Sequence, residues 1–533
     1  MRIVAGNLLF ESPSEVVRTS RPAELRTAFA QCEAALERGA WIAGYVPYES
    51  ADAALGVFGA PRAIELPDPV SVLHSPLLAT VDRATYDTTV ARLHRAIYDG
   101  DVYQVNYTIP FALATQSDPF ALWAYYARRC GARYQAYVED GNRRALSWSP
   151  ELFLEFDGRR VRTKPMKGTA PLEAIAELHD AKNRAEHVMI VDLLRNDLHR
   201  VCDRVEVERF TDIERYPTYA TMTSTIAGTL RDGVTIGDVF IAAFPCGSVT
   251  GAPKRAAMRF IAEVEAQPRG CYCGAIGFLS PQRRGWWNVA IRTATLDAVS
   301  GAGRFDVGGG IVADSRPSAE WAEMLVKSRF LRETPFDILE TFAGDADDVT
   351  IARHVERMLR SAQAFGIAVT EHEIAAALRQ DQGDKGLVRV RLGFDGSLHV
   401  FAETAGPLEE PVSIGLSSAR VRCDDPFLHH KTSWRPAHDA AMRETQTRGW
   451  FDALLQNGRG EITEGWRSNV FVDRGGTLLT PPLSAGVLPG ILRRRLLDER
   501  RAREATIVAG DLRDGFFVGN SARGLLRAVL ADI

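Results

Sequence analysis

The chain has 533 residues, of which 46% are hydrophobic and 25% are charged, and its formal net charge is −4. This length exceeds that of one ordinary hydrophobic core, so we expect two large domains or roughly three smaller ones. The composition is typical of a globular protein, and the slightly negative charge argues against a nucleic-acid partner.

The sequence shows no signal for secretion or membrane insertion. Residues 1–13 lack a basic segment followed by a long apolar run, and no stretch approaches about 18 uninterrupted apolar residues. The seven cysteines are scattered, and only Cys271 and Cys273 lie close together, which predicts neither a disulfide framework nor a zinc site. We therefore expect a cytoplasmic protein that has no membrane partner.

Helical and strand patterns alternate in the first 160 residues. Residues 23–40 have helical periodicity closed by a glycine, and residues 41–50 predict a strand that enters a turn. The segment 100–113 predicts a strand in which Tyr103, Val105 and Tyr107 form an apolar face, and the other face carries the amides of Gln104 and Asn106. Residues 149–156 predict a further strand, with Glu151 at its start.

The segment 164–200 organises the first half of the chain. Pro165 and Gly168 bracket Lys167, which predicts a tight turn that aims the lysine. A helical stripe of apolar residues follows, and Glu186 lies on or beside it, so this carboxylate needs a partner. An ordinary surface turn followed by a core helix, whose glutamate pairs with an arginine, is the alternative.

Several of these segments resemble blocks of one enzyme family. PMKGT (165–169) and EHVMIVDLLRNDL (186–198) resemble the signatures of chorismate-utilising enzymes, and GYVPYE and GDVYQVNYT resemble further blocks. A lysine before Gly-Thr implies aminodeoxychorismate synthase, because relatives usually carry alanine there. In those synthases a glutamate at the spacing of Glu151 pairs with the lysine as proton donor. A purely structural glutamate at the strand end stays an alternative.

A Gly/Ser/Thr-rich turn follows a buried, strand-like run that starts at residue 237. The turn leads into a helix with Pro253 near its first turn, an arrangement that exposes backbone N–H groups to an anion. Thr250 and Gly251 are therefore candidates to hold a substrate carboxylate. PCGSVTGAPK (245–254) resembles the family sequence P-S-G-S-V-T-G-A-P-K.

Two strands and a glycine-rich segment come next. The strands at 271–280 and 286–296 position Tyr272 and Arg292 to reach a substrate. A further strand, a turn at Gly308, Gly309 and Gly310 that allows close backbone approach, and a helix follow.

One face of that helix carries charged side chains at helical spacing, namely Glu320, Glu323 and Lys327. A solvated, salt-bridged stripe is the ordinary explanation. The block GGGIVADSRPSAEWAEMLVK (308–327), however, resembles a closing block of chorismate-utilising enzymes. This resemblance implies that Glu186 and Glu323 are direct ligands of Mg²⁺, which prefers oxygen ligands, that Glu320 supports them from behind, and that Lys327 faces the substrate.

One position departs from the family. Many relatives carry histidine where Thr221 falls in this sequence. The departure weakens any proton transfer by histidine and favours the route through Lys167.

The second half begins at a boundary near Thr334, so we expect domains at 1–333 and 334–533. Residues 352–367 predict an amphipathic helix, 388–401 a hairpin around Asp-Gly, and 451–482 a run of strands with Asn-Gly and Gly-Gly turns. The whole pattern is α+β.

The second half resembles the class IV fold of pyridoxal-phosphate enzymes in HHKTSWRP (429–436), EITEGWRSNVF (461–471) and SAGVLPGILRRRLLD (484–498). The resemblance implies a Schiff base on Lys431 and contact of Glu464 with the pyridine nitrogen. It also implies that the phosphate of pyridoxal 5'-phosphate is held by Arg353 and by the backbone of Gly490, Ile491 and Leu492. A surface lysine, a turn carboxylate and a helix-surface cation are the ordinary alternatives.

Together the two resemblances imply an α+β chain in which a chorismate-utilising fold, with antiparallel sheets sandwiched with helices, precedes a class IV fold. The pair implies an aminodeoxychorismate synthase component I joined to an aminodeoxychorismate lyase, which turns chorismate into 4-aminobenzoate for folate synthesis. Since no region resembles a Cys-His-Glu amidotransferase, ammonia would come from a separate glutaminase subunit or from solution. We also expect a homodimer through the second domain.

Two other functions stay open at this point. One is an anthranilate- or salicylate-type synthase joined to an aminotransferase. The other is a catalytically inactive regulatory protein, against which the intact Lys167, Glu186, Glu323, Lys431 and Glu464 argue.

Overall fold

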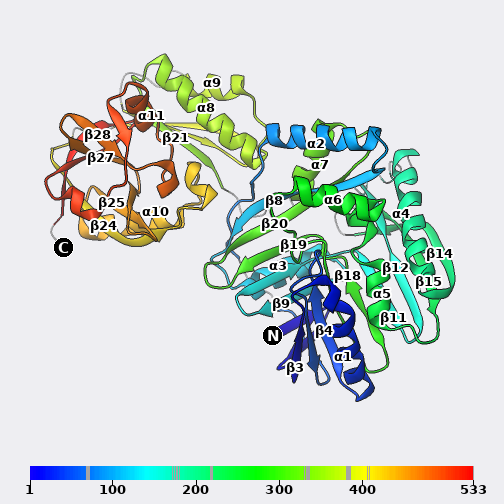
Figure 1. Cartoon of the computed structure of the whole chain (residues 1–533). Coiled ribbons are helices and arrows are strands. Elements are labelled where there is room, and N and C mark those ends of the chain that lie inside the picture. Colours follow the sequence, from blue (N-terminus) through cyan, green and yellow to red (C-terminus); the bar gives the residue numbers. More distant parts are fainter. Residues whose placement is uncertain are drawn as a thin grey trace. The chain divides into compact units, whose positions relative to one another are not determined.

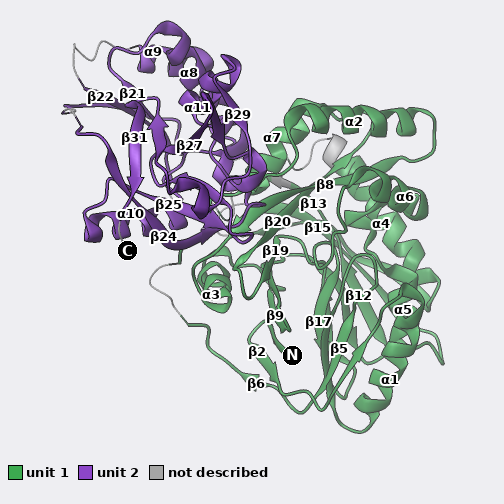
Figure 2. Cartoon of the chain, turned by 60° about the vertical axis from the view of Figure 1, so that its left-hand side comes forward, with its two compact units in different colours: residues 1–333 green, residues 334–533 purple. Residues whose placement is uncertain are grey.

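The computed structural model describes residues 1–67, 72–170, 172, 175, 178, 181–216, 220–328, 331, 336–379, 386–404, 406 and 408–531. It divides the chain into two compact units, Met1–Glu333 and Thr334–Ile533 (Figure 2). Thr334, the expected boundary residue, lies outside the described residues. Both units combine helices with mainly antiparallel sheets, which agrees with the α+β expectation.

Two antiparallel sheets build the first unit (Figure 1). The strand order of one sheet is β16 (Gly251–Ala252), β8 (Gln104–Ala114), β20 (Ala302–Ile311), β19 (Thr293–Asp297), β10 (Arg143–Ser147), β9 (Ala136–Asp140), β1 (Arg2–Ala5), β2 (Leu8–Glu11) and β6 (Arg62–Ala63), with β7 (Leu78–Ala79) beside β8. The order of the other is β13 (Met166–Ala170), β15 (Ala220–Leu230), β12 (Arg160–Lys164), β11 (Leu152–Asp157), β18 (Arg284–Asn288), β17 (Ala275–Leu279), β4 (Trp41–Val46), β5 (Ala54–Phe58) and β3 (Glu15–Arg18), with β14 (Cys202–Arg215) beside β15. Ile3 and Val138 of the first sheet share a buried cluster with Tyr45 and Ile276 of the second, so the sheets pack face to face.

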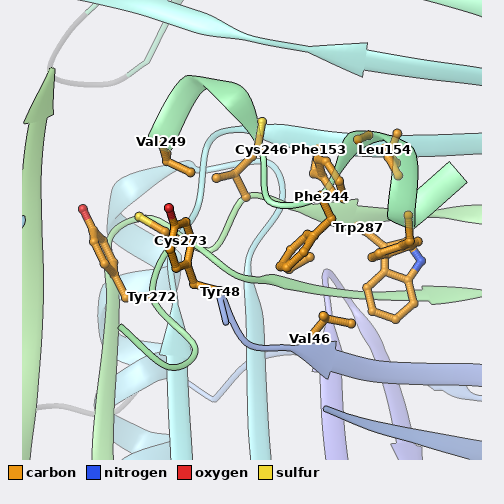
Figure 3. Packing of buried hydrophobic residues seen from close by; sticks show 14 of the residues in the cluster. Val46, Tyr48, Phe153, Leu154, Phe244, Cys246, Val249, Tyr272, Cys273 and Trp287 are labelled. Atoms are coloured by element: carbon orange, nitrogen blue, oxygen red, sulfur yellow. The ribbon is translucent and has the colours of Figure 1, made fainter. Parts of the chain in front are cut away.

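Helices flank these sheets. They are α1 (Leu25–Glu37), α2 (Arg83–Tyr98), α3 (Pro119–Cys130), α4 (Ala181–His199), α5 (Ile236–Ala243), α6 (Lys254–Val264) and α7 (Pro317–Ser328), with short 3₁₀ turns at Pro22–Glu24 and Gly247–Val249. The predicted helix at 23–40 is confirmed as α1 and the strand at 41–50 as β4. Phe240 on α5 packs against Phe29 at 4.4 Å and Trp287 at 5.0 Å between ring centroids. Figure 3 shows the adjoining side chains Phe153, Phe244 and Trp287 in the core.

The structure corrects four local predictions for the first unit. The buried run from residue 237 is a helix, α5, because its apolar residues face both α1 and α4. Lys167 lies in strand β13 and not in a tight turn, and residues 308–310 belong to β20 and not to a turn. The segment 286–296 is divided between β18 and β19.

The strand expected at 100–113 forms as β8, but both of its faces are buried. Gln104 and Asn106 are 0% and 6% exposed, whereas Tyr103, expected on the apolar face, precedes the strand and is 66% exposed. The amides therefore point into the protein, where they need partners.

The second unit contains a small and a large sheet. The small one is β21 (Ile338–Ala343), β22 (Leu387–Leu392) and β23 (Leu398–Glu403), flanked by α8 (Asp348–Phe365) and α9 (Glu371–Leu378). The large one has the order β26 (Ile462–Gly465), β25 (Asp452–Asn457), β24 (Val412–Val421), β31 (Gly524–Leu530), β30 (Phe516–Asn520), β27 (Asn469–Arg474), β28 (Thr477–Thr480) and β29 (Ala502–Glu504). Helices α10 (Pro436–Arg448) and α11 (Ile491–Asp498) complete the unit.

The predicted helix, hairpin and strand run of this half are confirmed as α8, as β22 with β23, and as β25 to β28. An additional pairing of β26 with β27 closes part of the large sheet into a ring. Glu464 and Asn469 are the opposed residues of that pairing. The structure thus places Glu464 where the ring of strands closes.

Candidate active sites

Lys167 is the centre of the candidate site in the first unit. The strand β13 bulges directly after it, because the pairing with β15 shifts register between Lys167 and Thr169 and Gly168 adopts φ 69°. The hydroxyl of Thr221 on β15 donates a hydrogen bond of 2.6 Å to the carbonyl oxygen of Gly168. Thr221, the departure from the family, therefore stabilises the bulge that positions the lysine.

Four charged side chains act on the Lys167 ammonium group, namely Glu186 on α4, Glu151 before β11, and Glu323 and Lys327 on α7. Burial lowers the pKa of Lys167, and the carboxylates only partly oppose this effect. The structure thus brings together five of the residues that the sequence singled out. These residues lie between positions 151 and 327 of the chain, so the tertiary fold assembles the group.

Glu151 is 3% exposed and accepts a hydrogen bond of 2.7 Å from the hydroxyl of Ser248. Burial raises the pKa of Glu151 to about 7, although Ser248 and Lys167 oppose the rise. A carboxyl group with this pKa holds a proton near neutral pH and can deliver it. Ser248 was not among the expected site residues, and its place in the G-S-V turn was the available signal.

His187 follows Glu186 and is another residue that sequence reasoning missed. Its side chain is 0% exposed, and one ring nitrogen lies 2.6 Å from the hydroxyl of Ser224. Burial, and then the charge of Lys167, lower the pKa of His187 to about 4. The imidazole beside the lysine is therefore neutral.

Thr250 and Gly251, the candidates to hold a substrate carboxylate, directly follow the 3₁₀ turn at 247–249. The N–H of Thr250 donates to the carbonyl of Gly247 at 3.2 Å, so this donor is already used within the turn. At Gly251, with φ 131°, a Cβ atom would lie 2.1 Å from the carbonyl oxygen of Gln104, so no other residue fits there. Pro253 caps α6, one position before the expected first turn.

A buried polar group holds this turn against β8. Arg269, which is 2% exposed, donates hydrogen bonds to the carbonyls of Val249 at 2.8 Å and Asn106 at 2.6 Å and pairs with Glu265. Tyr272 is 4% exposed and belongs to this group, because the charge of Arg269 acts on its hydroxyl. Figure 3 shows Tyr48 and Tyr272 below the segment of Val249.

The remaining expected substrate contacts are distributed as follows. A Cβ at Gly310 would lie 2.7 Å from the Gln104 amide nitrogen, and one at Gly309 would lie 3.5 Å from Glu320. Both amide atoms of Gln104 are buried without a hydrogen-bond partner among the described residues. Arg292 adopts φ 47° and its charge acts on the thiol of Cys130.

The carboxylates on α7 have different surroundings. Glu320 is 7% exposed and accepts a hydrogen bond of 2.7 Å from Ser315, while Glu323 pairs with Lys327 at 2.8 Å. Lys327 also donates to the carbonyl of Gly308 at 3.1 Å. Among the described residues no group of three or more His, Cys, Asp or Glu could hold a metal ion by itself. Glu186 and Glu323 still suit Mg²⁺, which readily completes its shell with water and substrate oxygens.

In the second unit, Lys431 lies beside the start of β21, because the N–H of Leu339 donates to its carbonyl oxygen at 2.7 Å. Burial lowers the pKa of Lys431 to about 7. A lysine of this pKa is partly neutral at neutral pH, which is the state that reacts with a carbonyl compound.

Glu464 is 4% exposed and is held by two side chains. His438 contacts it at 3.0 Å and the amide of Asn469 donates to it at 3.1 Å. At Gly490, which caps α11, a Cβ would lie 1.9 Å from the side-chain oxygen of Asn469. Position 490 therefore requires glycine, and no side chain at this position covers the backbone N–H groups at the start of α11. An anion that binds at a helix start needs such accessible N–H groups.

Arg353 and Arg357 on α8 lie toward opposite ends of α11. Arg353 pairs at 2.8 Å with Asp498, the last residue of α11. Its other terminal nitrogen is buried and has no hydrogen-bond partner among the described residues. Arg357 donates to the carbonyl of Pro489, just before the start of α11, at 3.2 Å. The assignment of Arg353 to the phosphate stays a prediction, and Arg357 is a second candidate that sequence reasoning missed.

Arg357 belongs to a buried charged triad. It donates to Glu340 at 2.8 and 2.5 Å, and His354 contacts the same carboxylate at 2.5 Å. Although burial alone would raise it, the pKa of Glu340 is held below its usual range by Arg357 and His354. Four features of this unit fit pyridoxal 5'-phosphate. They are the amine of Lys431, the carboxylate of Glu464, the start of helix α11 at Gly490 and the buried terminal nitrogen of Arg353.

Comparison with known proteins identifies a family for each of the two units. Residues 61–333 match the chorismate binding enzymes, and residues 336–530 match the class IV amino-transferases. The chain belongs to the chorismate binding enzymes. Its second unit is a class IV aminotransferase domain, so the expected succession of the two folds is confirmed.

The relatives of the first unit include two kinds of synthase. The chain is 38% identical over 263 residues to anthranilate synthase component 1 of Streptomyces coelicolor, covering 47% of this chain and 51% of that protein. It is 35% identical over 273 residues to aminodeoxychorismate synthase component 1 of Escherichia coli, covering 49% and 60%. The chain thus spans about half to three-fifths of the length of these relatives.

Among solved structures, anthranilate synthase component I of Streptococcus pneumoniae matches with a TM-score of 0.55 and 23% identity, over 62% of this chain and 92% of that one. This likeness shows the fold alone. Among the described residues, no helix is both long and apolar enough to cross a membrane.

Proposed function

We propose that the chain makes 4-aminobenzoate from chorismate in two steps. The first unit aminates chorismate to 4-amino-4-deoxychorismate, and the second eliminates pyruvate. The observation that carries the proposal is that Lys167 and Glu151 lie close enough for their charges to act on each other. Burial lowers the pKa of Lys167 and raises that of Glu151 to about 7. Ammonia comes from a separate glutaminase subunit or from solution, and the class IV unit forms a homodimer.

In the first step a nucleophilic amine and a proton donor act on the same ring. The neutral Lys167 amine adds at ring C2 while the C4 hydroxyl leaves with the proton of Glu151 as water. Ammonia then adds at C4, and Lys167 departs from C2. The unpaired amide of Gln104 gains a partner when substrate oxygens enter, because a buried amide without one costs about 1–3 kcal/mol.

Glu186 and Glu323 would hold Mg²⁺, which would supply positive charge for the substrate carboxylate and reduce its repulsion by the site's own carboxylates. Glu320 keeps α7 in place through Ser315. Lys327 pairs with Glu323 and donates to the carbonyl of Gly308, and its ammonium group faces the substrate beside these two residues.

In the second unit, Lys431 would hold pyridoxal 5'-phosphate, and Glu464 would keep its pyridine nitrogen protonated. When bound, the cofactor supplies an electron sink for the carbon next to the substrate amine. Lys431 takes the proton from C4 of the substrate, and the enolpyruvyl group leaves from C3 as the ring becomes aromatic. His438 and Asn469 keep Glu464 oriented.

An anthranilate-type synthase joined to an aminotransferase is the second candidate, because anthranilate synthases are among the relatives. The test incubates the full chain with chorismate, Mg²⁺, ammonium and pyridoxal phosphate. Since 2- and 4-aminobenzoate have the same mass, chromatography against both standards identifies the product. 4-Aminobenzoate supports the proposal, and 2-aminobenzoate overturns it.

A pair of variants tests the role of Lys167. Lys167→Ala is expected to abolish or redirect amination at C4 without unfolding the chain. Lys164→Ala is the matched control and keeps the activity, because Lys164 lies on β12, the preceding strand in the chain, and pairs with Glu214. Unchanged 4-amino-4-deoxychorismate production by Lys167→Ala removes Lys167 from the mechanism.

A further inference from the structure

A group of arginines surrounds Lys431 beyond the residues that the proposed function uses. Arg389 lies on β22, Arg435 immediately precedes α10, and Arg467 follows β26. The charges of Arg435 and Arg389 both act on Lys431, and the charge of Arg389 acts on Arg435 and Arg467 as well. The three guanidinium groups therefore share one region of the second unit with the lysine.

Arg435 is only loosely satisfied by its neighbours. Its polar contacts are a carbonyl of Trp466 at 3.4 Å and the carboxylate of Asp439 at 3.7 Å, both longer than an ordinary charged hydrogen bond. Its guanidinium group also lies 5.9 Å from the centroid of the Trp466 ring. Its side chain is 26% exposed, and burial lowers its pKa. The guanidinium thus keeps donors for a further partner.

Arg467 stacks on aromatic rings instead of pairing with an acid. It lies 4.2 Å from the centroid of Trp466 and 4.9 Å from that of Phe451. Among the described residues, its guanidinium has no hydrogen bond or ion pair. The residue itself is exposed, so a ligand can reach it.

The acids near these arginines are mostly committed elsewhere. Asp452 accepts hydrogen bonds from Ser468 and from backbone N–H groups, and burial raises its pKa to about 6. Glu464 is engaged by His438 and Asn469. Glu403 pairs with Arg389 at 3.1 Å, but both side chains are about half exposed, where such pairs contribute little. These acids therefore do not use all the hydrogen-bond donors of Arg435 and Arg467.

Cations that are partly desolvated and under-paired are costly, so an anionic ligand stabilises them. The planar guanidinium fork matches a carboxylate. Arg467 and Arg435 both lie over the indole ring of Trp466, at 4.2 and 5.9 Å from its centroid, so this ring holds the two guanidinium groups near each other. The phosphate candidates Arg353 and Arg357 lie on a different element, α8.

We propose that Arg389, Arg435 and Arg467 form a binding site for the two carboxylates of a cyclic dicarboxylate. This inference rests on the proposed function, because 4-amino-4-deoxychorismate carries one carboxylate on its ring and one on its enolpyruvyl group. It makes the class IV unit selective for dicarboxylates over monocarboxylates.

The test uses the full chain loaded with pyridoxal phosphate and two inert probes, isophthalate with two carboxylates and benzoate with one. The visible absorption of the bound cofactor reports binding in the second unit and not at the chorismate site. Isophthalate is expected to bind more tightly than benzoate. Arg435→Gln and Arg467→Gln are each expected to weaken isophthalate binding about tenfold or more, because each removes a charged hydrogen-bond partner.

Arg474→Gln is the matched control, since Arg474 lies in the same unit and its ion pair with Asp511 is partly exposed. It leaves isophthalate binding unchanged. With 4-amino-4-deoxychorismate as substrate, KM rises in Arg467→Gln while kcat changes little. Because Arg467 is exposed, this variant keeps its fold even if Arg435→Gln does not.

The outcomes separate this inference from the proposed function. If the parent forms 4-aminobenzoate but both variants bind isophthalate like the parent, the dicarboxylate site is wrong and the function stands. If the parent forms no 4-aminobenzoate, yet isophthalate binding depends on the arginines, the site stands and the function is wrong. Equal binding of benzoate and isophthalate by the parent also overturns the inference.

Discussion

Replacing Ser248 by alanine tests the role of Glu151 as proton donor. The serine hydroxyl donates to the Glu151 carboxylate at 2.7 Å, and both side chains are buried. This hydrogen bond favours the ionised carboxylate, so it holds the pKa at about 7 against the larger effect of burial. Removing it therefore raises the pKa of Glu151 further.

The size of the shift follows from the contact. A hydrogen bond to a charged group contributes about 1.5–3 kcal/mol. Since one pKa unit corresponds to about 1.4 kcal/mol, Ser248→Ala raises the pKa of Glu151 by about one to two units. The donor must be protonated, so the rate of the parent falls above about pH 7 and that of the variant falls above about pH 8 to 9.

The assay follows chorismate consumption against pH at a constant, saturating concentration of free ammonia. Lys167 sets the acidic limb, because only its neutral amine attacks and burial lowers its pKa. Ser248→Thr retains a hydroxyl and restores the parent profile. Ser280→Ala, which removes another buried serine hydroxyl that accepts from the Arg284 N–H, is the control. An alkaline limb that stays in place, or moves to lower pH, in Ser248→Ala refutes the role of Glu151.

Three further predictions concern metal, cofactor and stability. Glu186→Gln and Glu323→Gln each raise the Mg²⁺ concentration needed for half-maximal chorismate turnover, because an amide is a poorer ligand for a hard cation; titration curves equal to the parent's contradict the assignment. A fragment of residues 334–533 folds alone and turns yellow with pyridoxal phosphate. The Lys431→Ala variant of this fragment loses the link to the cofactor that borohydride traps, and a colourless parent fragment contradicts this prediction. Glu340→Gln leaves the buried guanidinium of Arg357 without a counter-charge and lowers the free energy of unfolding of the second unit by about 3–5 kcal/mol. Denaturant titration of the same fragment measures this change, and an unchanged midpoint shows that the triad does not stabilise the unit.

The sequence by itself determined the features that depend on neighbouring residues. The apolar periodicity of residues 352–367 specified helix α8, and Asp395–Gly396 specified the hairpin of β22 and β23, where Gly396 adopts φ 86°. Side-chain spacing and turn chemistry act over a few residues, so they can be read directly. The family blocks likewise singled out Lys167 and Lys431 before any fold was known.

Only the tertiary structure decided what the same residues do in three dimensions. The composition of Gly308–Gly310 predicts a turn. These residues lie in a strand instead, because β20 pairs with β8 at ten positions from Ala302 to Ile311. Ser248 meets Glu151 across 97 residues of chain, and Arg357 meets Pro489 across 132. The pKa values of Lys167, Glu151 and Lys431 follow from burial and distant charges, which no local pattern of residues contains.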